Sequence, residues 1–179
     1  LYAGHAVAAV AATSVKNAQD ALALIEVEYE VLPHVIDVED AMKPDAPVLH
    51  DFLRTGGVDP KPESASNVAS RLEFKLGDLD AGFAAADVIV ERTYKTKPVH
   101  QGYLEPHACL VSVAKDGQAT IWSSSQGHFM VRSATAIMTG LNVADIRAIP
   151  AEIGGGFGGK TIVYLEPLAL IMARISGFP

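Results

Sequence analysis

Cysteine is almost absent from this sequence, since Cys109 is the only one among 179 residues. One thiol excludes an internal disulfide framework, and it excludes any zinc or iron–sulfur site that needs several cysteines from this segment. This low usage favours a reducing compartment, and we expect a cytoplasmic protein. Cys109 lies in an alternating run and is predicted to be a small buried hydrophobic residue.

An excess of positive charge is also missing. The chain carries 14 Lys and Arg against 21 Asp and Glu, which gives a net charge of −7. Phosphate contact needs a basic face, so this balance argues against a nucleic-acid-binding protein. A composition of 49% hydrophobic and 20% charged residues indicates a globular chain with a buried core.

No apolar run approaches the length of a membrane span. The longest, residues 6–12 and 168–173, are far shorter than the roughly 18 residues that a bilayer crossing requires. The chain starts at Leu1 without a signal-peptide pattern, and it stops at a Gly and a Pro, where a helix ends and another strand could begin. We therefore expect an excerpt of a longer protein.

Hydrophobic periodicity predicts an α+β fold. A hairpin is expected where Asp116 and Gly117 separate two apolar runs. It would belong to a meander of antiparallel strands. Residues 37–66 are rich in Pro and Gly and are the best candidate for a linker. The predicted helices are 16–24, capped by Ser14, 80–86, 128–139, ending at Gly140, and 163–175; the predicted strands are 5–12, 25–31, 71–76, 88–93, 108–114, 118–123 and 145–151.

Two groupings of possible metal ligands lack the required pattern. Glu26, Glu28 and Glu30 alternate with apolar residues, which predicts a solvated strand face and no cation cage. His100 and His107 bracket Glu105 without zinc spacing or a second ligand cluster. We expect both histidines to have structural or supporting roles.

A cluster of five glycines within six positions lies between the last predicted strand and helix, at residues 154–159. Each glycine costs about 0.5–1 kcal/mol relative to alanine, so the cluster needs a reason. Glycine lets the backbone approach a bulky partner closely, and an anionic group is a natural guest at a helix N-terminus. A tight turn with nothing bound is the simpler alternative.

The same residues satisfy the spacing of a nucleotide-binding P-loop, from Gly154 to Lys160 and Thr161. In that interpretation, Lys160 would reach nucleotide phosphates and Thr161 would hold magnesium. Only 18 residues follow Thr161, and they offer no strand ending in a magnesium-binding Asp. Pro150 and Glu152 also interrupt the preceding strand. The P-loop is kept as the alternative function.

Three sequence blocks together resemble a known family. They are HQGYLEPH at 100–107, WSSSQ at 122–126 and IGGGFGGK at 153–160. Their order is similar to that in the molybdopterin-binding large subunit of the molybdenum hydroxylases, the family of xanthine dehydrogenase, aldehyde oxidoreductase and carbon monoxide dehydrogenase. The resemblance implies the end of a hammerhead β-α-β domain at 1–52, a linker at 53–67 and the N-terminal part of the molybdopterin-binding domain at 68–179.

The resemblance also implies site residues. Gln126 would act in catalysis and cofactor binding, because its amide matches one that hydrogen-bonds the apical oxo ligand of molybdenum. No residue here would bind the metal directly, since the pterin holds it. Thr161 stands where xanthine-oxidising members carry a glutamate, which places it in the substrate pocket and favours an aldehyde, aromatic or carbon monoxide-like substrate. The other expected cofactor-binding residues are Gly155, Gly156, Phe157, Gly158 and Gly159.

The activity implied by the resemblance is hydroxylation of an aldehyde, an aromatic heterocycle or a related small molecule, with water as the oxygen source. The expected cofactor is molybdenum-molybdopterin in its cytosine dinucleotide form. Iron–sulfur clusters and FAD would lie on partner subunits or domains of a hetero-oligomer. The family's catalytic glutamate and copper-binding cysteine lie further along its chain, so this segment alone is expected to be inactive. A catalytically silent interaction subunit is a third hypothesis.

Overall fold

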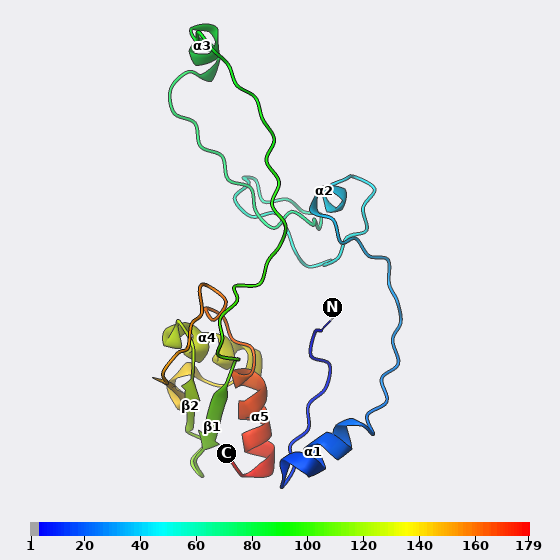
Figure 1. Cartoon of the computed structure of the whole chain (residues 1–179), viewed down its shortest axis with the longest axis vertical. Coiled ribbons are helices and arrows are strands. Elements are labelled where there is room, and N and C mark those ends of the chain that lie inside the picture. The colour runs from blue at the N-terminus through cyan, green and yellow to red at the C-terminus, as the bar shows by residue number, and fades with distance from the viewer. Residues whose placement is uncertain (1–3) are drawn as a thin grey trace. The chain divides into compact units, whose positions relative to one another are not determined.

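The structure is a computed structural model that describes residues 4–179, and these form two compact units (Figure 1). One unit comprises Lys95–Pro179 together with the described part of Leu1–Ile25, and the other is Glu26–Tyr94. The expectation that the sequence is an excerpt rests partly on Leu1, and this residue lies outside the described residues. The predicted domain limits at residues 52 and 68 stay a prediction.

A hairpin forms the first two strands of a three-stranded sheet. β1 (Cys109–Val113) and β2 (Ala119–Ser123) run antiparallel. Gly117 closes the turn with a φ of 91°, a conformation that glycine adopts at no steric cost. The sequence signal is local to this turn, and the predicted hairpin is confirmed.

The third strand enters the sheet by a crossover. β3 (Ile146–Pro150) pairs with β2 in parallel, with Ala148 opposite Ile121. The connection consists of α4 (His128–Thr139) and a short 3-10 turn, η1 (Val143–Asp145). α4 has the predicted bounds and ends at Gly140, whose φ is 72°. The predicted antiparallel meander does not extend beyond the hairpin among the described residues: β3 runs parallel to β2, because the helical crossover returns the chain to the same end of the sheet.

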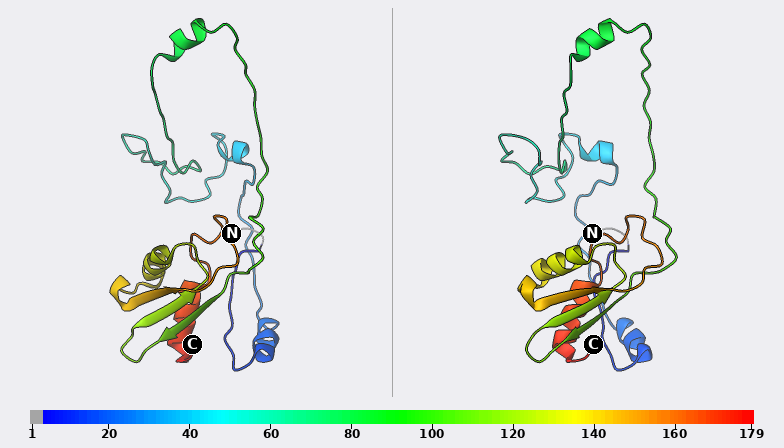
Figure 2. Two further views of the ribbon diagram at one scale, coloured as in Figure 1. Left: turned by 60° about the vertical axis from the view of Figure 1, so that its left-hand side comes forward. Right: turned by 90° about the vertical axis from the view of Figure 1, so that its left-hand side faces the viewer.

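The core lies between one face of this sheet and two helices, α4 and α5 (Glu166–Ser176), as Figure 2 shows. α5 begins three residues later than predicted, with Pro167 in its first turn, where a missing N–H costs nothing. The opposite face of the sheet exposes Leu110 and Trp122. The buried hydrophobic core consists of Val111, Ala119, Ile121, Val131, Ala136, Ile146, Leu170 and Ala173. The mixture of helices and strands confirms the α+β expectation at this coarse level.

Four predicted strands do not form. Residues 5–12, 25–31, 71–76 and 88–93 contain no strand residues in the structure. Most of their side chains are exposed, and Leu76 is fully so. A strand is stabilised by a neighbour that completes its hydrogen-bond ladder, and these segments have none among the described residues. An isolated parallel bridge between Gly56 and Ser70 directly precedes residues 71–76.

Two predicted helices form in shortened versions. α1 (Val15–Leu22) begins after Ser14, whose hydroxyl accepts the N–H of Asn17 as predicted. α3 (Leu79–Ala84) begins after Asp78, whose carboxylate accepts the N–H of Ala81. A capping side chain satisfies an N–H group that the first helical turn would otherwise leave unpaired.

The Pro- and Gly-rich region contains α2 (Val38–Ala41) and is organised by one side chain. Asn67 accepts the N–H of Leu49 at 2.9 Å and donates to the carbonyls of Ala41 and Pro47 at 3.0 Å each. These three hydrogen bonds join parts of the segment that are 18 to 26 residues apart in sequence. Among residues 4–179, no helix combines the length and hydrophobicity of a membrane span.

Candidate functional site

The site is built where the end of β2 meets the loop between β3 and α5. Gln126 follows β2 closely, and its side-chain oxygen, Oε1, accepts the N–H groups of Gly158 at 3.0 Å and Lys160 at 3.1 Å. The backbone N–H of Gln126 donates to the carbonyl of Lys160 at 2.8 Å. The structure therefore brings the predicted glutamine and the predicted glycine loop together.

These bonds fix the direction of the Gln126 amide. Both partners of the side chain are N–H donors, so the oxygen must face them and the NH₂ group, at Nε2, must face away. Within residues 4–179, Nε2 has no hydrogen-bond acceptor, and the Gln126 side chain is exposed. The arrangement leaves the NH₂ group of Gln126 as an oriented, uncharged and exposed donor.

Three glycines of the loop pack closely against side chains of this chain itself. A Cβ added to Gly154 would lie 2.7 Å from Glu105 Cβ, and one added to Gly156 would lie 2.5 Å from Gln126 Oε1. At Gly159 the added atom would lie 2.7 Å from Tyr103 Cε1. Such distances are well below van der Waals contact. Packing within the chain therefore favours glycine at these three positions even without a bound ligand.

The middle of the loop carries the exposed side chain of Phe157 and has unpaired backbone N–H groups among the described residues. Phe157 has a φ of 47°, which is unfavourable for a bulky side chain by about 1–2 kcal/mol, and its ring is 74% exposed. The backbone N–H groups of Gly155, Gly156 and Phe157 have no acceptor within the described part of the chain. Together with Gln126 Nε2 they form a set of donors suited to an oxygen-rich partner.

A cleft of about 700 Å³ opens beside Gln126. It lies between the start of α4 and β3, and its walls include His128, Arg132 and Arg147. Arg132 Nε donates to the carbonyls of Val143 and Ile146, which ties α4 to the start of β3. The Gln126 region thus has open space next to it.

The loop's lysine points inward. The Lys160 side chain is 1% exposed, and its Nζ lies 2.5 Å from Glu105 Oε2. In a P-loop this ammonium group would reach phosphates, and the helix would begin at the loop. Here α5 begins only at Glu166, and Thr161 Oγ1 donates to the carbonyl of Gly158 at 3.1 Å. The geometry gives no support to the nucleotide-binding alternative.

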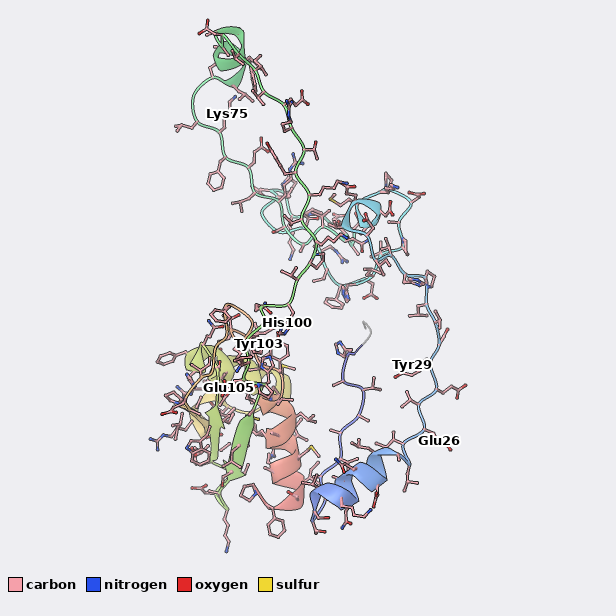
Figure 3. The ribbon with its side chains drawn as sticks, in the orientation of Figure 1. Glu26, Tyr29, Lys75, His100, Tyr103 and Glu105 are labelled. Atoms are coloured by element: carbon pink, nitrogen blue, oxygen red, sulfur yellow. The ribbon has the colours of Figure 1, made fainter. Side chains whose placement is uncertain are left out.

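The partner of Lys160 comes from an extended segment that leads into β1. Tyr103, Glu105 and His107 are half-buried and alternate with exposed residues, so they share one side of the segment. Figure 3 labels Tyr103 and Glu105 near the glycine loop. Neither Tyr103 nor Glu105 was predicted from the sequence to have a role. The only signal in the sequence is their spacing of two residues, which places them on the same side of an extended segment.

Electrostatics bind this segment to the loop. Glu105 Oε2 also accepts the N–H of Gly154 at 2.8 Å. The pKa of Glu105 is lowered, first by the hydrogen bond from Lys160 and then by that from Gly154. The pKa of His107 is lowered by burial and then by the charge of Lys160. Its Nε2 lies 2.6 Å from the Tyr103 hydroxyl, and this contact agrees with the predicted supporting role.

Other predicted residues lie outside this arrangement. Glu26, Glu28 and Glu30 are exposed, and Figure 3 labels Glu26 on the extended segment after α1. Cys109 is half-buried beside the core, and burial, followed by the nearby Glu166 carboxylate, raises its pKa to about 11. Within residues 4–179, no three His, Cys, Asp or Glu side chains gather closely enough to hold a metal ion.

Residues 60–179 match the family model of the molybdopterin cofactor-binding domain. The chain belongs to this family. The resemblance carried by the three sequence blocks is thereby confirmed, and the match includes both Gln126 and the glycine loop.

Curated relatives of this molybdopterin cofactor-binding domain include several oxidoreductases. The chain is 34% identical over 202 residues to a probable hypoxanthine oxidase, XdhD, of Escherichia coli K12, matching 99% of this chain and 21% of that protein. It is 35% identical over 161 residues to the carbon monoxide dehydrogenase large chain of Hydrogenophaga pseudoflava, and the match covers 88% of this chain and 20% of that protein. The chain thus spans about a fifth of the length of these relatives.

Solved structures give the same family. Quinoline 2-oxidoreductase from Pseudomonas putida 86 superposes with a TM-score of 0.76 at 28% identity, over 93% of this chain and 20% of that one. Carbon monoxide dehydrogenase from Oligotropha carboxidovorans superposes with a TM-score of 0.71 at 31% identity, over 92% and 21%.

Proposed function

We propose that this segment forms one wall of the molybdenum-cofactor site in an oxidoreductase that hydroxylates an aldehyde, an aromatic heterocycle or a related small molecule with water. The observation that carries the proposal is the orientation of Gln126. Its oxygen is held by N–H groups of Gly158 and Lys160, so its NH₂ group is turned away from them and would be available to an acceptor of the cofactor. The names of the relatives support an oxidoreductase built around molybdopterin.

The donor set fits the proposed cofactor. A molybdenum-pterin group presents oxo and phosphate oxygens, which accept hydrogen bonds and carry negative charge. Gln126 Nε2 would donate to the apical oxygen of the metal without adding charge. The free N–H groups of Gly155, Gly156 and Phe157 would face further acceptors of the same group. The bound cofactor supplies the oxidation–reduction chemistry, and this chain supplies orientation and hydrogen bonds.

Thr161 is proposed to line the substrate pocket. Its hydroxyl donates to Gly158, so it offers a substrate only acceptor capacity and a methyl group, whereas a glutamate would add charge. This chemistry favours an uncharged or apolar substrate over xanthine. The cleft beside Gln126 gives space next to that residue, but neither Thr161 nor the glycine loop lines it.

The remaining features of the proposal concern the whole protein. They are the cytosine dinucleotide form of the pterin, iron–sulfur and FAD partners in a hetero-oligomer, a cytoplasmic location, and a hammerhead domain whose end includes α1. The catalytic glutamate of the family would lie outside this segment, so the segment alone would be inactive.

The test is metal analysis of the full-length protein, followed by the variant Gln126→Ala. We expect molybdenum in the wild type and a fall in turnover of about tenfold or more in the variant, because a lost donor at a reacting centre costs a few kcal/mol. Absence of molybdenum from the wild type would refute the proposal, as would wild-type turnover of a fully loaded variant. The variant Gln118→Ala is the control, since that side chain contacts Asp145, away from the loop.

A further inference from the structure

One carboxylate oxygen ties together the two ends of the glycine loop. Glu105 Oε2 accepts the backbone N–H of Gly154, the first residue of the loop, at 2.8 Å. The same oxygen accepts the ammonium group of Lys160, the last residue of the loop, at 2.5 Å. Because the two contacts are 49 and 55 residues away in sequence, neither is a by-product of local chain geometry.

The surroundings hold this ion pair in one place. The Lys160 side chain is 1% exposed and that of Glu105 is 29% exposed. Lys160 Nζ lies 4.9 Å from the centre of the Tyr103 ring, a cation–π contact, and 3.5 Å from the carbonyl oxygen of Pro106. A buried ammonium group needs such partners, since an unpaired buried charge is strongly unfavourable. The pair therefore has little freedom to rearrange.

The ion pair connects to the proposed cofactor contact through the backbone. The N–H of Lys160 donates to Gln126 Oε1, and its carbonyl accepts the N–H of Gln126. Fixing the Lys160 side chain thus fixes the backbone that orients the Gln126 amide.

We infer that Glu105 and Lys160 are positioning residues that clamp the glycine loop in the conformation that presents Gln126 Nε2 and the N–H groups of residues 155–157 to the cofactor. This inference rests on the proposed function. Loosening this clamp should change the cofactor environment, and because Lys160 is fully buried it should also destabilise the domain, so the cofactor readouts are compared with those of a variant destabilised elsewhere.

The experiment uses the full-length, cofactor-loaded protein with the variants Lys160→Met and Glu105→Gln. The measurements are the Mo(V) electron paramagnetic resonance spectrum, the rate of cofactor release, and kcat and KM. We expect changed g-values, cofactor release faster by about tenfold or more, and a lower kcat with nearly unchanged KM. The double variant, which removes both charges, should recover part of the loss because neither charge is left unpaired.

A matched control separates positioning from folding. Glu166 is also a buried carboxylate, but it binds the hydroxyl of Ser123 and the N–H groups of Tyr164 and Leu165, and it makes no hydrogen bond to residues 154–160. Glu166→Gln should lower the melting temperature and leave the Mo(V) spectrum unchanged. If Lys160→Met or Glu105→Gln does not fold, the charge-preserving variants Lys160→Arg and Glu105→Asp give the same readouts.

The outcomes distinguish the two proposals. If molybdenum is present and Gln126→Ala alters the spectrum, but the Glu105 and Lys160 variants leave both spectrum and release rate unchanged, the clamp is wrong and the proposed function stands. The clamp is also wrong if Glu166→Gln changes the spectrum as much as the Glu105 and Lys160 variants do. If the wild-type protein binds no molybdenum, both proposals fail.

Discussion

Substituting Gly156 by alanine tests the site without removing any of its functional groups. The new Cβ would lie 2.5 Å from Gln126 Oε1 and 2.7 Å from Gln126 Cδ. Carbon atoms in contact prefer about 3.5–4.0 Å, so the amide must retreat by roughly 1 Å. The φ of Gly156 is outside the left-handed region, so the clash is the main perturbation.

The expected cost follows from the contacts that the retreat breaks. Gln126 Oε1 would lose the N–H groups of Gly158 and Lys160, worth about 1–3 kcal/mol together. A misplacement of about 1 Å at a reacting centre lowers the rate by about 10²-fold. We therefore expect Gly156→Ala in the full-length enzyme to lower turnover by about two orders of magnitude while molybdenum stays bound.

A double-mutant cycle gives the sharpest assay. If Gly156→Ala acts by displacing the amide, it should cost little when added to Gln126→Ala, where no amide is left to displace. Gly82→Ala is the control, because nothing lies within 4 Å of the added Cβ and α3 tolerates alanine. Fully additive losses in turnover, or a Gly156→Ala enzyme as active as the wild type, would rule out displacement of the amide as the cause.

Two further predictions concern the core and the thiol. Leu170 is fully buried, so Leu170→Ala should lower the free energy of unfolding of this domain by about 2–5 kcal/mol in chemical denaturation, whereas Leu110→Ala, on the exposed sheet face, should cost far less; equal losses would contradict the assigned core. Cys109, with a pKa of about 11, should react with iodoacetamide at pH 8 roughly 10²-fold more slowly than an ordinary thiol and faster as the pH rises toward 11, when followed by peptide mass spectrometry. Rapid alkylation at pH 8 in the folded protein would contradict the burial of this thiol.

The sequence predicted best those elements whose signals are local. The turn at Asp116 and Gly117, the end of α4 at Gly140 and the cap at Ser14 each depend on one or two residues, and all three are confirmed. These features need only a residue that tolerates positive φ or supplies a capping oxygen.

Strands were harder because alternation does not supply a partner. Phe74 and Leu76 belong to a run with the correct period, yet both remain exposed and unpaired with any strand among the described residues. The parallel pairing of β3 with β2 was also missed, because it depends on how α4 packs and not on the composition of β3.

The candidate site shows the same division. The family resemblance singled out Gln126 and Phe157, and the structure brings Gln126 into contact with the loop, although their functional roles stay predictions. The bonds from Glu105 to Gly154 and Lys160 went unpredicted because they join residues about 50 positions apart. Gly156 and Gly159 were assigned to cofactor binding, whereas both also pack closely against side chains of this chain.

The proposed function depends above all on the orientation of the Gln126 amide, and a structure of the full-length protein with its cofactor bound would reveal that orientation. We predict that Gln126 Nε2 lies within about 3.2 Å of an oxygen on the molybdenum, with Oε1 still accepting from Gly158 and Lys160. A cofactor bound elsewhere, or a Gln126 amide whose NH₂ group faces the protein, would contradict the proposed role of this residue.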